Sequence, residues 1–82
     1  MKIYSLDTLK NIIENNNGKV VIFGFGTLGK LSKKVLNKLE IKVDYFCDSD
    51  VRKHGEVYES IEVISIDSLN KLDKNTNIFI SH

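Results

Sequence analysis

At residues 20–30 the chain reads Val20-Val21-Ile22-Phe23-Gly24-Phe25-Gly26-Thr27-Leu28-Gly29-Lys30. A compact apolar run, typical of a buried strand, leads directly into Gly-x-Gly-x-x-Gly, and an amphipathic helix pattern follows. The glycines suit three different tasks: Gly24 allows a tight turn, Gly26 lets a phosphate approach the backbone, and Gly29 lets the helix lie close to the sheet. The stretch therefore predicts a strand, a glycine-rich turn and a helix whose N-terminus can meet an anion.

An acidic residue at the end of the next predicted strand strengthens this interpretation. Asp48 follows the strand predicted at 41–47 and lies 19 positions after Gly29. A carboxylate about 20 positions beyond such a turn accepts hydrogen bonds from ribose hydroxyls of a bound dinucleotide. The alternatives are that the glycines serve only a tight turn and that Asp48 and Asp50 only cap neighbouring backbone N–H groups. We favour the ribose role for Asp48.

The rest of the chain alternates short helix and strand patterns. Ser5 is placed to cap a helix over residues 6–15, and the turn that follows ends at Gly18. Strands are predicted at 19–23, 41–47, 61–64 and 78–80, a second helix at 27–39, a polar loop at 51–60, and a brief helix at 68–72 capped by Asp67. Strand–helix–strand units with short connections imply parallel pairing. We therefore predict an α/β fold with a small parallel sheet, strand order 3-2-1-4 and an N-terminal helix.

The second helix is predicted to be amphipathic. One apolar stripe, of the kind that faces a core, is formed by Leu28, Leu31, Val35, Leu36 and Leu39. The lysines fall largely on the other side, which is expected to be solvated: Lys30, Lys33, Lys34 and Lys38. Thr27 is placed either to cap this helix or to donate its hydroxyl to a phosphate, and the two roles are compatible.

Size and composition limit the possible classes of protein. A chain of 82 residues makes one small domain, here residues 1–82, with the helix and turn at 1–18 and a βαβ core at 19–82. A net charge of +1 gives no electrostatic sign of nucleic acid or a membrane surface as partner. No apolar run approaches the roughly 20 residues that span a bilayer. The single cysteine, Cys47, fits a small buried residue in a reducing compartment, so we expect a cytoplasmic location.

Residues for catalysis are not evident. The sequence shows no nucleophile–base–acid set and no metal-ligand cluster, so we assign no catalytic residue and no metal. Basic residues follow the acidic turn at Arg52, Lys53 and His54. Such residues can take the 2′-phosphate of NADP, but a solvated loop is the simpler interpretation, and Asp48 would repel that phosphate. The pattern therefore favours NAD over NADP.

Three segments together resemble a known group of domains. They are the glycine turn at 20–30, the segment Val43-Asp44-Tyr45-Phe46-Cys47-Asp48-Ser49-Asp50, and the segment Ile61-Glu62-Val63-Ile64-Ser65-Ile66-Asp67-Ser68-Leu69. In this order they look like the small Rossmann-like domains of bacterial polysaccharide and nucleotide-sugar modifying proteins, including nucleotide-sugar 4,6-dehydratases, sugar acetyltransferases and methyltransferase-associated modules. By position, the resemblance implies a phosphate loop made of Gly24, Gly26, Thr27, Leu28 and Gly29, with Asp48 at the ribose.

The resemblance also implies a missing part. Members of this group continue beyond the fourth strand into further helices or a catalytic domain, so we expect a fragment or a truncated relative. The leading hypothesis is a domain that binds NAD(H) or a nucleotide-sugar in a carbohydrate-modifying protein. The alternative is an interaction or dimerisation module that kept the fold without the ligand, since small domains often need oligomerisation. An enzyme acting alone is the third hypothesis, and it lacks a residue to name as acid or base.

Overall fold

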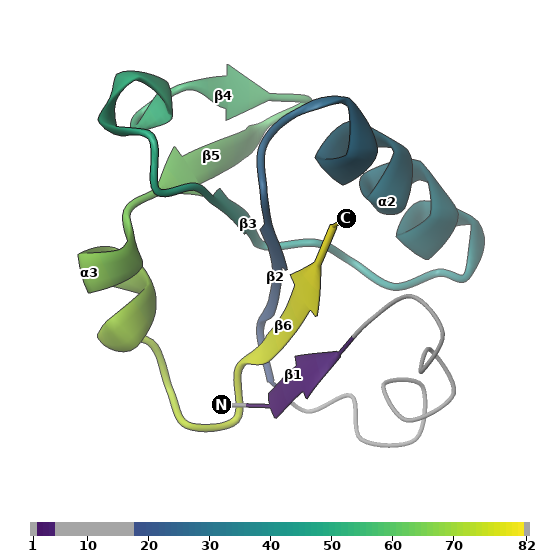
Figure 1. Cartoon of the computed structure of the whole chain (residues 1–82). Coiled ribbons are helices and arrows are strands. Elements are labelled where there is room, and N and C mark those ends of the chain that lie inside the picture. Colours follow the sequence, from purple (N-terminus) through teal and green to yellow (C-terminus); the bar gives the residue numbers. More distant parts are fainter. Residues whose placement is uncertain (1, 5–17, 82) are drawn as a thin grey trace.

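The computed structural model describes residues 2–4 and 18–81 (Figure 1). Its strands are β1 (Lys2–Tyr4), β2 (Val20–Phe23), β3 (Tyr45–Cys47), β4 (Val57–Tyr58), β5 (Ile61–Ile64) and β6 (Asn77–Ile80). Its helices are α2 (Thr27–Lys38), the 3₁₀ turn η2 (Val51–Lys53) and α3 (Ile66–Asn70). The helix predicted over residues 6–15 lies outside the described residues. The described part is a mixed α/β fold.

The strands form one mostly parallel sheet in the order β1-β6-β2-β3-β5-β4. Every neighbouring pair is parallel except β4 and β5, which form an antiparallel hairpin. The full order differs from the predicted 3-2-1-4, because β1 lies beside β6 at one edge and β4 lies beside β5 at the other. The four predicted strands lie between these two additions. Strands of three and two residues are too short to give a period-2 pattern in the sequence.

Helices cover both faces of the sheet, α2 on one and α3 on the other (Figure 1). The chain moves from β2 to β3 toward one edge and returns from β5 to β6 toward the other, so right-handed connections place the two helices on opposite faces. Side chains of β2 alternate accordingly. Ile22 packs in the cluster that contains Leu36 of α2, and Val21 packs in the cluster that contains Leu69 of α3.

The face that α2 presents to the sheet differs from the predicted one. Its buried residues are Gly29, Ser32, Lys33 and Leu36, whereas most of the predicted apolar stripe is exposed: Leu28, Leu31, Val35 and Leu39. The large side chains in this layer come from the sheet and its approaches, such as Phe46 and Phe79. Gly29 lets the start of the helix lie close to the Gly24 carbonyl, so helix periodicity alone predicted the wrong side.

Several element boundaries also differ from the predictions. The strand predicted at 41–47 is limited to β3, although Ile41 and Val43 are still buried. The polar loop predicted at 51–60 contains η2 and β4. Helix α3 begins at Ile66, because Ser65 rather than Asp67 caps it by accepting a 3.1 Å hydrogen bond from the Ser68 N–H. A hydroxyl two residues earlier thus moves the helix start toward β5.

Candidate functional site

The glycine turn forms one wall of a shallow cavity of about 320 Å³. The cavity is made by residues 24–29 together with Asp48, Lys53 and Ser81, which follow the carboxyl ends of β2, β3 and β6. Strand β3, which follows β2 in the chain, lies on one side of β2, and β6 lies on its other side. Ligands of open α/β sheets bind in such a crevice, where the strand order reverses at the carboxyl ends.

Two of the three glycines are required by the protein itself. Gly24 has a φ of +110°, a conformation that suits glycine, and a Cβ there would meet the Ser81 hydroxyl. A Cβ on Gly29 would meet the carbonyl oxygen of Gly24. Gly29 therefore lets the first turn of α2 lie against the glycine turn.

Gly26 is different, because no contact within the protein requires it. Its backbone is extended, with φ −145° and ψ −159°, which any residue can adopt. A Cβ on Gly26 would have nothing within 4 Å. The position is the N-cap of α2, where serine, threonine, asparagine or aspartate is preferred, yet no side chain caps the helix. Gly26 thus leaves both open space and uncapped N–H groups at the cavity.

Phe25 fixes the turn from within. Its side chain is buried, and its ring packs edge-on against Phe46 at 4.9 Å and Tyr58 at 6.0 Å between centroids. Its N–H donates to the carboxylate of Asp48 at 2.8 Å, and its carbonyl accepts from Lys53 Nζ at 3.0 Å. These contacts hold the turn in place before any ligand binds.

Asp48 braces the turn against the segment after β3. Its Oδ2 accepts from the Phe25 N–H and its Oδ1 accepts from the Asp50 N–H, both at 2.8 Å. The local capping that we weighed as an alternative therefore takes place. A carboxylate has about four acceptor positions, so capacity remains for a hydroxyl from the cavity.

The protonation of Asp48 follows from these contacts. Burial favours the neutral acid, but hydrogen bonds from the Asp50 and Phe25 N–H groups and the charge of Lys53 outweigh it and lower the pKa of Asp48 below its usual value. Asp48 is therefore an anion at neutral pH, and it serves as an acceptor rather than an acid.

We predict that Asp48→Asn will lower the free energy of unfolding by about 1–3 kcal/mol at neutral pH, because one buried N–H donor will face an amide NH₂ instead of a carboxylate. The folded-state pKa is lowered, so the ionised group stabilises the fold above its unfolded pKa of about 3.8. That contribution is lost as the pH falls through the lower folded value. Urea unfolding across acid pH will show the gap between wild type and variant narrowing, whereas the exposed control Glu62→Gln will change little. A gap that stays constant with pH would contradict this role.

The sequence favoured a solvated loop for Lys53, but the structure places this residue at the cavity. Its Nζ is 3.6 Å from Asp48 Oδ2 and bonds to the Phe25 carbonyl, so its charge is held beside the glycine turn. Arg52 is exposed and pairs with Asp50, and its hydrogen bonds lower the pKa of Asp50 to about 2. His54 Nε2 lies 2.7 Å from the Asp48 carbonyl oxygen. The sequence hint for Lys53 was that it follows Asp48 by only five positions. The 3₁₀ turn η2 then brings its side chain back toward Asp48.

The cavity favours negative charge. The first N–H groups of α2 have no acceptor within the helix, and the positive end of its dipole is here. Its first turn contains no acidic residue, and Thr27 and Leu28 are exposed at the cavity. Thr27 does not cap the helix, so its hydroxyl is available to a ligand. Asp48 carries the one carboxylate among the cavity residues, and Lys53 partly balances it.

The buried thiol, the possible metal ligands and the helix lengths bear on what other functions would require. Cys47 is fully buried, and burial followed by the charge of Asp48 raises the pKa of its thiol to about 11, so it is not a nucleophile. Among residues 2–4 and 18–81, no cluster of histidine, cysteine and carboxylate side chains is arranged to hold a metal ion. In the same residues, no helix has the length and apolar character needed to cross a bilayer.

Comparison with known proteins finds one weak similarity. The chain is 29% identical over 92 aligned residues to the non-toxic nonhemagglutinin type E of Clostridium botulinum, an alignment that covers 99% of this chain and 7% of that protein. The chain therefore spans about 7% of the length of the curated relative it matches. No protein-family profile and no solved structure matches the chain.

Proposed function

We propose that this chain is a Rossmann-like domain that binds a nucleotide, NAD(H) or a nucleotide-sugar, at the glycine turn. The observation that supports the proposal most is that no contact within the protein requires a glycine at position 26. Its open Cβ position and the uncapped N-terminus of α2 leave a gap of the kind that a pyrophosphate fills. Gly24 and Gly29 carry less weight, because the protein requires them with or without a ligand.

The remaining cavity residues have roles that fit this ligand. The N–H groups of Thr27, Leu28 and Gly29 point along the start of α2 and would donate to phosphate oxygens. Lys53 would add a positive charge beside the phosphates, and a remaining acceptor position of Asp48 would take a ribose hydroxyl. We favour NAD over NADP, because a 2′-phosphate would approach the carboxylate of Asp48.

The wider role follows from the resemblance described above and is part of the same proposal. The domain would hold its nucleotide for a carbohydrate or polysaccharide biosynthesis protein in the cytoplasm, with the chemistry performed by residues outside this chain.

Calorimetric titration tests the proposal. We expect saturable heat with NAD or UDP-glucose and a dissociation constant of about 1 mM or tighter, with NADP weaker than NAD. Absence of heat with all three ligands at millimolar concentration would contradict nucleotide binding.

A second candidate function is self-association through α2. Four exposed apolar side chains form one row along this helix, here called the apolar row: Leu28, Leu31, Val35 and Leu39. Steps of three and four residues suit helix–helix packing, and a two-fold axis would place the row of one copy against that of a second copy. Small domains often gain the core they lack in this way.

We predict that, if the apolar row joins two copies, the chain will sediment as a dimer and Leu31→Glu will make it monomeric, because a buried charge would lie in the contact. Lys34→Glu, at an exposed position of the same helix, is the control and will leave the dimer intact. Sedimentation of the wild-type chain as a monomer would rule out this candidate.

A further inference from the structure

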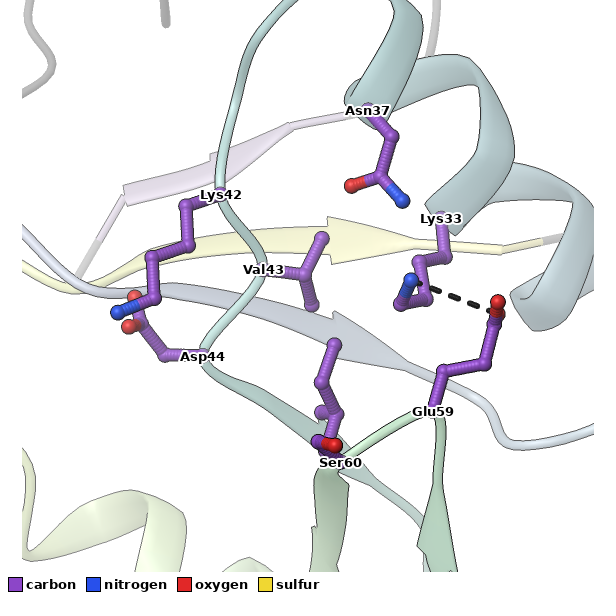
Figure 2. A pocket seen from close by; sticks show the side chains of 8 residues that line it. Lys33, Asn37, Lys42, Val43, Asp44, Glu59 and Ser60 are labelled. Carbon is purple, nitrogen blue, oxygen red and sulfur yellow. Dashed lines mark ion pairs between the residues drawn. The ribbon is translucent and has the colours of Figure 1, made fainter.

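A second cavity, of about 410 Å³, lies on the α2 side of the sheet (Figure 2). Its walls come from the C-terminal half of α2, from the residues that lead into β3, and from the turn that joins β4 to β5. These residues precede β3 and β5, whereas the glycine turn follows the carboxyl end of the parallel strand β2. The second cavity is therefore at the opposite edge of the sheet from the proposed nucleotide site.

Lys33 brings an ammonium group on a buried stem to this cavity. Its side chain is only 8% exposed, and its Nζ lies 3.4 Å from Glu59 Oε2. That separation exceeds the 2.7–2.9 Å typical of a charge-assisted hydrogen bond. Among the described residues Lys33 Nζ makes this ion pair and no closer hydrogen bond, so the three donors of the ammonium are open to an acceptor. The group is thus prepared to meet an acceptor that enters the cavity.

Glu59 is held opposite Lys33 by an unfavourable turn. Glu59 and Ser60 join the paired residues Tyr58 and Ile61, and their φ angles are +49° and +70°. Turns of this kind prefer asparagine, aspartate or glycine, so glutamate and serine are unfavourable at these positions. The turn nevertheless presents a glutamate whose side chain is 52% exposed at the cavity. A half-exposed carboxylate remains able to bind a second cation.

The charges of the cavity balance. Figure 2 shows Lys33 and Glu59 toward one end, Lys42 and Asp44 toward the other, and the buried Val43 between them. A simple anion that binds Lys33 would lie beside the Glu59 carboxylate and be repelled by it. A ligand with its own cation would give Glu59 a replacement partner, and an apolar body would lie over Val43. The arrangement favours a ligand that carries both charges.

We propose that this cavity binds a small zwitterion with an apolar body, such as a free amino acid with a branched aliphatic side chain. Its carboxylate accepts from the Lys33 ammonium, and its ammonium donates to Glu59. This proposal does not depend on nucleotide binding, because the two cavities share no residue.

Titration of the ¹⁵N-labelled chain separates the parts of this ligand. L-leucine is compared with 4-methylpentanoate, which lacks the amino group, and with 3-methylbutylamine, which lacks the carboxylate. We expect leucine to give saturable amide shifts at Asn37, Val43 and Ser60, with an affinity at least about tenfold higher than either analogue. No saturable shift with leucine, or equal affinity for the acid alone, would overturn the proposal.

Three variants test the two contacts. Lys33→Met keeps the apolar stem and removes the donors, so leucine affinity will fall by about tenfold or more, while the exposed control Lys34→Met will bind normally. Glu59→Gln keeps the length of the side chain, and we expect it to remove the preference for leucine over 4-methylpentanoate even if Lys33→Met fails to fold. Unchanged leucine selectivity in Glu59→Gln would contradict the assigned role.

Discussion

Replacing Gly29 with alanine will destabilise the chain by about 3 kcal/mol or more, the upper range for overpacking a tight contact. The new methyl group would meet the carbonyl oxygen of Gly24, which is held in a turn with φ +110°. Neither partner can move easily, because the Gly24 N–H donates to the Cys47 carbonyl at 2.7 Å and Ser81 bonds to the same turn. Helix propensity alone would predict the opposite sign, since alanine is favoured over glycine by about 1 kcal/mol within a helix.

Urea unfolding of matched variants measures this effect. Gly26→Ala is the control, because its methyl group would have nothing within 4 Å and its backbone is extended. We expect the control to stay within about 0.5 kcal/mol of the wild type, as surface substitutions usually do. Equal midpoints for Gly29→Ala and the wild type would show that α2 does not lie against the glycine turn as described.

Replacing Gly26 with serine will separate stability from binding. Serine is a preferred N-cap, and its hydroxyl would accept from the free N–H groups at the start of α2, so the free energy of unfolding will rise by about 0.5–1 kcal/mol. The same hydroxyl would occupy the space and the donors assigned to the phosphates. Affinity for NAD will therefore fall by about tenfold or more.

The pair of measurements on Gly26→Ser distinguishes two accounts of the glycine. If Gly26 serves only the turn, serine will lower the free energy of unfolding and leave the affinity for NAD unchanged. If Gly26 serves a ligand, thermal unfolding without nucleotide will shift upward while calorimetric affinity for NAD falls. Gly26→Asp places a negative charge at the same position, and we expect an even larger loss of affinity for NAD because the carboxylate repels the phosphates.

The strand–turn–helix at the centre of the fold could be predicted from sequence because its signals are local. The apolar run of β2, the spacing of the three glycines and the acidic residue after β3 are each visible within a few positions. The structure brings Gly24, Gly26, Thr27, Leu28, Gly29 and Asp48 together around one cavity. The sequence could not tell which glycines the fold itself requires. That depends on the contacts of Gly24 with Ser81 and of Gly29 with the glycine turn.

The parts that could not be predicted depend on packing between distant segments. The buried face of α2 was predicted wrongly because Gly29 lies against the Gly24 carbonyl, a contact that helix periodicity does not contain. The Lys33 side chain is buried, and the carboxylate that it faces lies on the β4–β5 turn, 26 positions away. The edge strand β1 depends on pairing with β6 at the other end of the chain. The two members of each pair are far apart in the sequence, so no short segment contains both.

The central claim is that a nucleotide phosphate binds at Gly26, and amide chemical shifts on addition of NAD test it most directly. We predict saturable shifts at residues 24–29 and at Asp48 and Lys53, and their loss in Gly26→Ser. Shifts that fail to saturate, or saturable shifts that persist unchanged in Gly26→Ser, would contradict the claim.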